Sequence, residues 1–203
     1  RDAAQDGEAV ARALDLRFAL DQVLGGELAP LLDAQRIVAA GHSYGANTTL
    51  LAVGAQVTRN GSTLDFRDPR FKAAIVLSAP PFYGSSDPAS ILGPVTVPTL
   101  HVTATEDVIR IPGYHSGAED RVAVFDAVGG ADKTLAVFAG GSHSIFTDRA
   151  GTGGVTLNPQ VKAATQLLSL AFLKKVFDGE GAGLRLWPLQ FAGILARYTP
   201  PAP

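Results

Sequence analysis

The stretch 36–45, RIVAAGHSYG, decides the fold of this chain of 203 residues. Its first half, 36–40, is a short apolar run of the kind that forms a buried strand in a parallel sheet. Positions 41–45 then fit the pattern G-x-S-x-G, and the Ala- and Leu-rich run 46–57 is typical of a helix. When a strand reverses into a helix within one turn, only small residues fit around the tip. The sequence therefore predicts a nucleophile elbow with Ser43 at its tip.

Strands and helices also alternate on both sides of this turn. Apolar residues at helical spacing predict helices over 6–24, 121–128 and 159–177. Short apolar runs predict strands over 36–40, 71–77, 99–104 and 134–138. The tail from 179 to 203 is expected to be irregular, since it contains several prolines. Together these elements indicate an α/β fold with a mostly parallel sheet flanked by helices.

A serine hydroxyl is a weak nucleophile at neutral pH, so a base must activate Ser43. His42 adjoins the serine and should project away from its hydroxyl, while His101 lies inside a strand pattern and is expected in the core. His115 and His143 each follow a strand, so both should lie at the same edge of the sheet as Ser43. His143 has small neighbours and comes last in the chain. It is therefore the preferred base, with His115 as the alternative.

A carboxylate should orient the imidazole of this base and stabilise its cation. The strand predicted over 99–104 is followed by Glu106 and Asp107, again at the reactive edge of the sheet. Asp107 is the preferred acid and Glu106 the alternative. The chain order Ser43, Asp107, His143 is the order found in α/β-hydrolases, and it differs from the orders of the chymotrypsin and subtilisin types.

The segments 36–45, 97–107 (VPTLHVTATED) and 139–146 (AGGSHSIF) resemble the α/β-hydrolase superfamily. Within it, the chain is most similar to bacterial esterases grouped with platelet-activating-factor acetylhydrolases, chlorophyllases and cutinase-like polyester hydrolases. It also resembles proteins labelled dienelactone-hydrolase-like, but true dienelactone hydrolases use cysteine and this chain has none. The resemblance extends over about residues 6–177, and its motifs specify the superfamily better than the substrate.

The resemblance implies a serine esterase that works through an acyl-enzyme, with Ser43 as nucleophile, His143 as base and Asp107 as acid. The backbone N–H of Tyr44 would be one donor of the oxyanion hole. Loops at the strand ends are expected to provide an apolar pocket wall, although Phe82 and Phe146 could instead pack beneath the loops. The expected wall residues are Phe82, Tyr83, Ile109, Ile145 and Phe146. The alternatives are a serine peptidase or acyltransferase on the same fold, or a non-catalytic hydrolase-like binding protein.

The sequence departs from the family pattern before the elbow. These enzymes have about four strands there, together with a second oxyanion donor in an early loop, whereas here 42 residues precede Ser43. The first strand would then have an uncovered edge, which invites aggregation. We therefore expect 1–178 to be the C-terminal portion of one catalytic domain, with 179–203 as a tail packing on it. An upstream segment or a second chain would supply the missing strands, and a complete minimal hydrolase is the alternative.

Composition excludes several other classes. Lys and Arg number 17 against 19 Asp and Glu, so there is no basic footprint for nucleic acid. The absence of Cys excludes disulfides, thiolate metal sites and a cysteine nucleophile. No apolar window approaches the ~18 residues of a membrane span. No nucleotide-binding glycine motif is present, and the i, i+4 pair of His115 and Glu119 lacks a third ligand, so neither cofactor nor metal is expected. Secreted, periplasmic and cytoplasmic locations all remain open.

Overall fold

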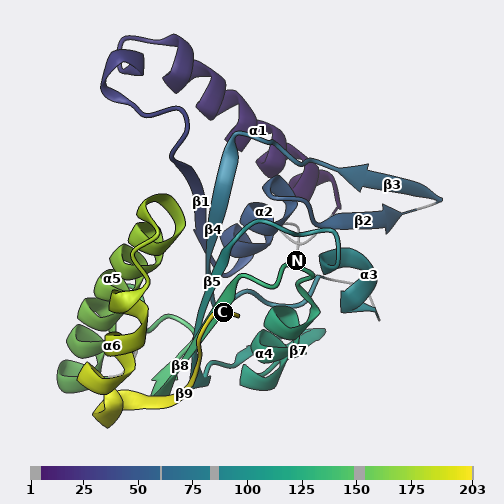
Figure 1. Cartoon of the computed structure of the whole chain (residues 1–203). Coiled ribbons are helices and arrows are strands. Elements are labelled where there is room, and N and C mark those ends of the chain that lie inside the picture. Colours follow the sequence, from purple (N-terminus) through teal and green to yellow (C-terminus); the bar gives the residue numbers. More distant parts are fainter. Residues whose placement is uncertain (1–5, 60, 83–86, 149–153, 203) are drawn as a thin grey trace.

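A central sheet of five strands organises the molecule (Figure 1). The computed structural model describes residues 6–59, 61–82, 87–148 and 154–202. Across the sheet the strands run in the order β1 (Ile37–His42), β4 (Phe71–Leu77), β5 (Thr99–Glu106), β8 (Lys133–Ser142) and β9 (Leu195–Thr199). The first four are parallel, and β9 pairs antiparallel with β8. All loops that follow the parallel strands therefore open at one edge of the sheet.

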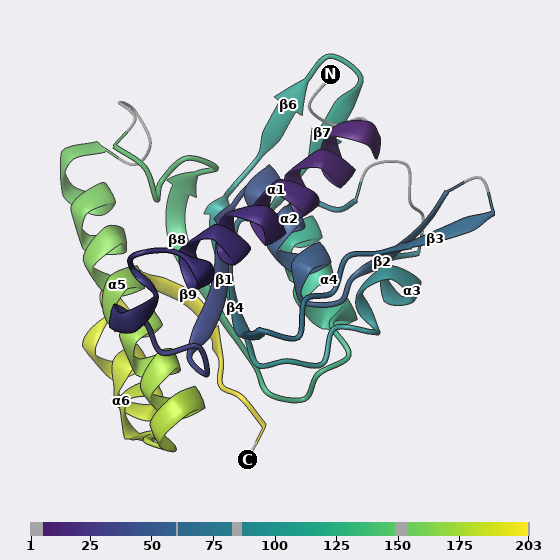
Figure 2. The same ribbon diagram turned by 90° about the horizontal axis from the view of Figure 1, so that it is seen from above.

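Helices cover both faces of the sheet (Figures 1 and 2). One face carries α5 (Gly154–Asp178) and α6 (Ala182–Gln190). The other carries α1 (Asp6–Gly25), α2 (Tyr44–Ala52), α3 (Pro88–Leu92) and α4 (Ala118–Ala127). This mostly parallel sheet between two helical layers confirms the expected α/β fold class.

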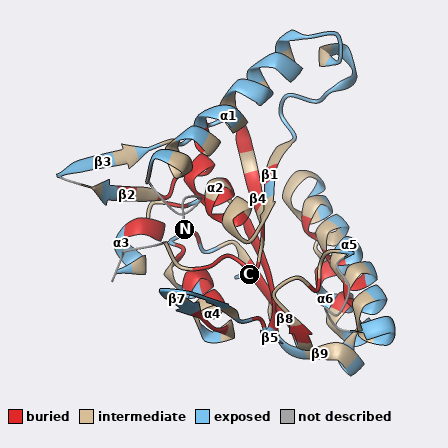
Figure 3. Cartoon of the chain, turned by 180° about the vertical axis from the view of Figure 1, so that it is seen from behind, coloured by how far each residue is buried: buried red, intermediate tan, exposed pale blue. Residues whose placement is uncertain are grey.

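The apolar runs of the sequence form the buried centre of the protein. The three central strands, β4, β5 and β8, are mostly buried, as expected for parallel strands between helical layers, whereas the outer strands β1 and β9 are more exposed (Figure 3). Leu50, Val76 and Leu92 belong to the core under α1–α4, and Phe138 and Phe172 to the core under α5 and α6. The sheet thus holds the loops at its edge on a rigid base.

Two short hairpins extend from this framework. The first joins β2 (Gln56–Arg59) to β3 (Ser62–Asp65), and the second joins β6 (Ile109–Ile111) to β7 (Tyr114–Ser116). The helix expected over 46–57 was therefore placed wrongly at its end. It stops at Ala52 because Gly54, with a φ of 122°, takes a conformation that no helix continues. Asn60, in the expected turn, lies outside the described residues.

The tail is regular, contrary to expectation, since it forms α6, a 3-10 turn (Ala192–Ile194) and β9. Pro188 lies inside α6, where it has no N–H to offer the carbonyl of Leu184. The hydroxyl of Tyr198 on β9 donates to that carbonyl at 2.9 Å instead. The buried indole of Trp187 donates to the carbonyl of Ala164 on α5 at 2.8 Å. Two side-chain hydrogen bonds therefore attach the tail to itself and to α5.

Other element boundaries differ less from the expected ones. A second short 3-10 turn (Ala29–Leu31) follows α1. The last long helix, α5, begins five residues earlier than the expected start at 159, so that Pro159 lies within it. At the far edge of the sheet, β1 pairs with β4 on one side, and none of the described strands pairs with its other side. None of the described helices is long and apolar enough to cross a membrane.

Candidate active site

Ser43 stands at the turn between β1 and α2 in a strained backbone conformation. Its φ of 56° and ψ of −124° lie outside the regions that L-residues prefer. A side chain on Gly41 would begin 2.2 Å from the carbonyl oxygen of Gly45, so only glycine fits at the first of these positions. Nothing stands within 4 Å of the place where a Cβ on Gly45 would lie. The predicted sharp turn is present. The close approach of residues 41 and 45 requires glycine at position 41 but not at position 45.

The three residues predicted as nucleophile, base and acid meet in one line of hydrogen bonds. Nε2 of His143 lies 2.6 Å from Oγ of Ser43, and Nδ1 of His143 lies 2.7 Å from Oδ1 of Asp107. They follow β1, β8 and β5, respectively, at one edge of the sheet. The parallel strand order thus brings together side chains that lie up to 100 positions apart in the sequence.

Asp107 is held as a buried carboxylate. Burial alone would raise its pKa, but hydrogen bonding by His143, the nearby Ser78 hydroxyl, the charge of Arg121 and a hydrogen bond from Thr103 lower the pKa to about 2. Thr103 Oγ1 donates to Oδ2 at 2.7 Å. Ser78 lies close enough to act on the carboxylate without making a hydrogen bond of ordinary geometry. The carboxylate is therefore ionised at neutral pH and able to stabilise a cation on His143.

The loop that carries His143 is held in place by α5 and by the core beneath it. Gly140 and Gly141, near the end of β8, have φ angles of 76° and 90°, a region that favours glycine, and they bend the strand just before His143. The amide of Asn158 on α5 donates to the carbonyl of Ile145 at 2.7 Å. Ile145 itself is fully buried in the core. Its side chain therefore supports the loop from the interior, and the expectation that Ile145 lines a substrate pocket is wrong.

His42 has a place in the site that the sequence did not suggest. Its Nε2 lies 2.7 Å from the backbone carbonyl of His143, and the two rings are 4.9 Å apart. Burial is the main cause of the lowered pKa of His42, and the charge of His143 adds to it. His42 therefore contacts the loop of the candidate base, rather than the hydroxyl of Ser43.

The alternative acid and base lie elsewhere. Glu106 is exposed at the end of β5, and His115 is exposed on β7. Because His115 is on a strand and Glu119 on α4, the two do not share a helical face. Among the described residues, no group of three or more His, Asp or Glu could hold a metal ion. His101 is buried in β5, as expected from its strand pattern.

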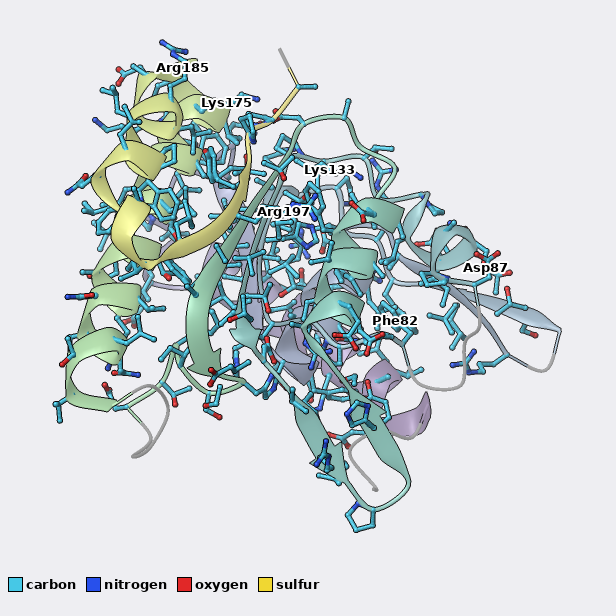
Figure 4. All side chains as sticks on the ribbon, turned by 90° about the horizontal axis from the view of Figure 1, so that it is seen from below. Phe82, Asp87, Lys133, Lys175, Arg185 and Arg197 are labelled. Carbon is cyan, nitrogen blue, oxygen red and sulfur yellow. The ribbon has the colours of Figure 1, made fainter. Side chains whose placement is uncertain are left out.

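The other expected site residues surround the elbow unevenly. Tyr44 is the first residue of α2, so its N–H lies at the helix N-terminus beside Ser43. The ring of Phe146 is 6.0 Å from that of His42, and Ile109 lies half-buried on β6. Phe82 packs partly against the core on the side of the sheet that carries α3 and α4 (Figure 4). Tyr83 lies outside the described residues.

Comparisons with known proteins show a likeness in fold but no match to a family model or to a curated protein. No protein-family model matches the chain, and no curated protein matches it in sequence. The fold is similar to a solved structure described as a novel cold-adapted esterase from an Arctic intertidal metagenomic library. The two are 21% identical with a TM-score of 0.49, and the match covers 70% of this chain and 53% of that one. The chain thus spans about half the length of that esterase.

Proposed function

We propose that this protein is a serine hydrolase that cleaves carboxylic esters through an acyl-enzyme intermediate. The observation that carries this proposal is the unbroken line of hydrogen bonds from Ser43 through His143 to the buried Asp107. A serine on an ordinary strand–helix turn needs neither the 2.6 Å contact to an imidazole nor a buried carboxylate behind that imidazole. The order of the three residues along the chain is also that of α/β-hydrolases.

The reaction follows from these contacts. His143 takes the proton of the Ser43 hydroxyl through Nε2 while Oγ attacks the ester carbonyl carbon. The tetrahedral intermediate then collapses, the C–O bond to the alcohol breaks, and His143 returns the proton to the departing alcohol. A water molecule, deprotonated by His143, releases the acid from Ser43 in the same way. Throughout, Asp107 keeps the Nδ1 side of the imidazole hydrogen-bonded and stabilises its cation.

The negative charge on the carbonyl oxygen needs donors at the elbow. The N–H of Tyr44, at the N-terminus of α2, is one such donor in this proposal, because the positive end of a helix favours a forming anion. A second donor, and the strand that would pair with the outer side of β1, would come from an upstream segment or from a second chain. In that reading residues 1–178 form the C-terminal portion of one catalytic domain, with 179–203 packing on it.

Apolar groups near the elbow favour an uncharged acyl or aromatic ester, either a small molecule or a polymer. Phe146, with its ring 6.0 Å from that of His42, is partly exposed, and Ile109 is half-buried on β6, two positions after Asp107. Hydrolysis of a short p-nitrophenyl ester by the wild type, by Ser43→Ala and by Ser90→Ala tests the proposal. Ser90 is an exposed serine on α3 and serves as the control. We expect Ser43→Ala to lose turnover and Ser90→Ala to retain it.

Other outcomes would favour the alternatives. Cleavage of an anilide at a rate comparable to that of the ester would indicate a peptidase, and transfer of the acyl group to an added alcohol in preference to water an acyltransferase. A wild-type protein that hydrolyses no ester and is not labelled by a fluorophosphonate would contradict the enzymatic proposal. A binding protein with a hydrolase-like fold would then be the better description.

A further inference from the structure

A small cavity lies inside the protein near Asp107, the candidate acid. Three residues that act on this carboxylate, Ser78, Thr103 and Arg121, form part of its wall. The cavity has a volume of about 10 Å³, which is close to the room that one water molecule needs. Apolar side chains of β4, β5 and β8 form part of its wall. The polar part consists of Ser78, His101, Thr103 and Arg121, each at most 3% exposed. None of these four residues is part of the proposed catalytic line.

Several polar atoms of this wall lack a hydrogen-bond partner. Among the described residues, Nε and Nη2 of Arg121, Nε2 of His101 and Oγ of Ser78 have no such partner. Leaving buried donors and acceptors unpaired is costly, and such groups in native proteins are usually satisfied by protein or by ordered water. Arg121, with two unpaired donors, and His101, with one unpaired ring nitrogen, line the same small cavity, and together they offer the partners that one enclosed water uses.

The charges around the cavity favour a neutral ligand over an anion. Nη2 of Arg121 lies 3.4 Å from Oδ1 of Asp107, and both side chains are almost completely buried. The guanidinium charge is therefore already balanced by the carboxylate. Burial lowers the pKa of His101 to about 3, so its ring carries no charge at neutral pH. A buried site without net charge offers little to a chloride or phosphate, whereas water can both accept from Arg121 and donate to His101.

We propose that the cavity binds one water molecule between Arg121 and His101, and that this water holds Arg121 as a positioning residue beside Asp107. The proposal rests on the proposed function in so far as Asp107 is the acid of a catalytic triad. The other end of the guanidinium is already fixed, because Nη1 donates to Oγ of Ser116 at 2.9 Å. The water would complete the placement of Arg121, whose charge offsets part of the carboxylate's attraction for a cation on His143.

A crystal structure of the wild-type protein at high resolution, from crystals soaked in sodium bromide, tests the water. We expect a single water peak in the cavity, within hydrogen-bond distance of Arg121 and His101, and no anomalous bromide signal there. A bromide peak would make the cavity an anion site and overturn the proposal. An absence of density between the two side chains would overturn it as well.

The positioning role is tested by following the ring of His143 by NMR as a function of pH. Besides its own loop, four groups act on this ring: Ser43 at Nε2, Asp107 at Nδ1, Arg121 behind that carboxylate, and His42 at the backbone carbonyl. Removing the positive charge in Arg121→Met should move the titration midpoint upward by about half a pH unit or more. Arg121→Lys keeps the charge and should stay near the wild type. An unchanged midpoint in Arg121→Met would overturn the role.

A second variant keeps the test decisive if Arg121→Met does not fold. His101→Phe leaves the ion pair of Arg121 and Asp107 in place and removes only the partner of the water. We expect the water peak to disappear and the midpoint of His143 to shift, by less than in Arg121→Met. A midpoint identical to that of the wild type would contradict the proposal. Neither the water peak nor the titration midpoint depends on ester turnover. A protein without esterase activity would therefore contradict the proposed function but would not decide the role of the water and Arg121.

Discussion

The sheet edge that carries Ser43 and the layer made of α5, α6 and β9 are built in opposite ways. The edge that carries Ser43 consists of the loops that follow the parallel strands. In these loops Ser43 and Ser78 have φ angles of 56° and 52°, and the carboxylate of Asp107 is completely buried. We call α5, α6 and β9 the C-terminal layer. The large apolar side chains of Phe172 and Trp187 are buried in it. The polar atoms of Trp187 and Tyr198 in this layer donate to backbone carbonyls.

The proposed reaction and the stability of the fold therefore depend mainly on different parts of the molecule. Strained backbone costs on the order of 1–3 kcal/mol per residue and persists only where the surrounding structure enforces it. The C-terminal layer contributes apolar burial, and none of its described non-glycine residues has a positive φ. Substitutions at the active-site edge should therefore change activity more than stability, and substitutions in the C-terminal layer should do the reverse.

The largest effect is expected at His143. Its replacement in His143→Ala removes the base, and we expect ester turnover to fall by about five orders of magnitude. The variant His115→Ala, which changes an exposed histidine on β7, is the matched control and should retain near wild-type turnover. Initial rates with a p-nitrophenyl ester measure both. The reverse pattern would show that the base was assigned to the wrong residue.

The next largest effect concerns stability. Trp187 is 3% exposed and packs its ring against those of Phe138 and Tyr198. Truncation in Trp187→Ala should lower the free energy of unfolding by about 3–5 kcal/mol, because it opens a large cavity and removes the indole hydrogen bond to the carbonyl of Ala164. Denaturant unfolding measures this, with the exposed Leu189→Ala on the same helix as control. A stable variant would show that α6 contributes little to the core.

The elbow offers a finer comparison between its two glycines. In Gly41→Ala, the new Cβ would overlap the carbonyl of Gly45, so the turn must shift and the Ser43 hydroxyl with it. A displacement of about 1 Å at a reacting group can reduce turnover by about 100-fold. Gly45→Ala meets no atom within 4 Å and should be nearly neutral. Equal turnover in the two variants would contradict this account of the elbow.

The smallest expected effect is a dependence of stability on pH. The fold lowers the pKa of Asp107 from an ordinary value to about 2, so the fold favours the ionised carboxylate. Its contribution, roughly 2 kcal/mol, is therefore present above about pH 4 and lost as the pH falls towards 2. Unfolding of the wild type and of Asp107→Asn between pH 2 and 6 measures it. The free energy of unfolding of Asp107→Asn should not show this loss. If it falls with pH in parallel with that of the wild type, the ionised Asp107 does not contribute to stability in this way.

The parts of the candidate site that the sequence could predict depend on local sterics or on strand order. The elbow was predictable because G-x-S-x-G between an apolar run and a helical run leaves few other conformations for residues 41–45. Asp107 and His143 could be selected because each follows a parallel strand, and parallel strands end at one edge. These inferences required no knowledge of packing between distant segments.

What the sequence did not predict depends on contacts between distant segments. Arg121 is read from the sequence as part of an ordinary helix, and only the fold shows its guanidinium buried beside Asp107. His42 was expected to project away from the Ser43 hydroxyl, and only the fold shows that it contacts the loop of His143, 101 positions later. The helix around Pro188 was missed because the hydroxyl that satisfies the freed carbonyl comes from Tyr198. Each of these depends on a partner that no local pattern reveals.

The proposed function requires that His143 activates Ser43 as a nucleophile. Incubation with a fluorophosphonate, followed by mass spectrometry of the intact protein and of its peptides, tests this activation. We expect one adduct per molecule, located on Ser43, absent in Ser43→Ala and strongly reduced in His143→Ala. An adduct on another residue, or labelling of Ser43 that persists without His143, would contradict it.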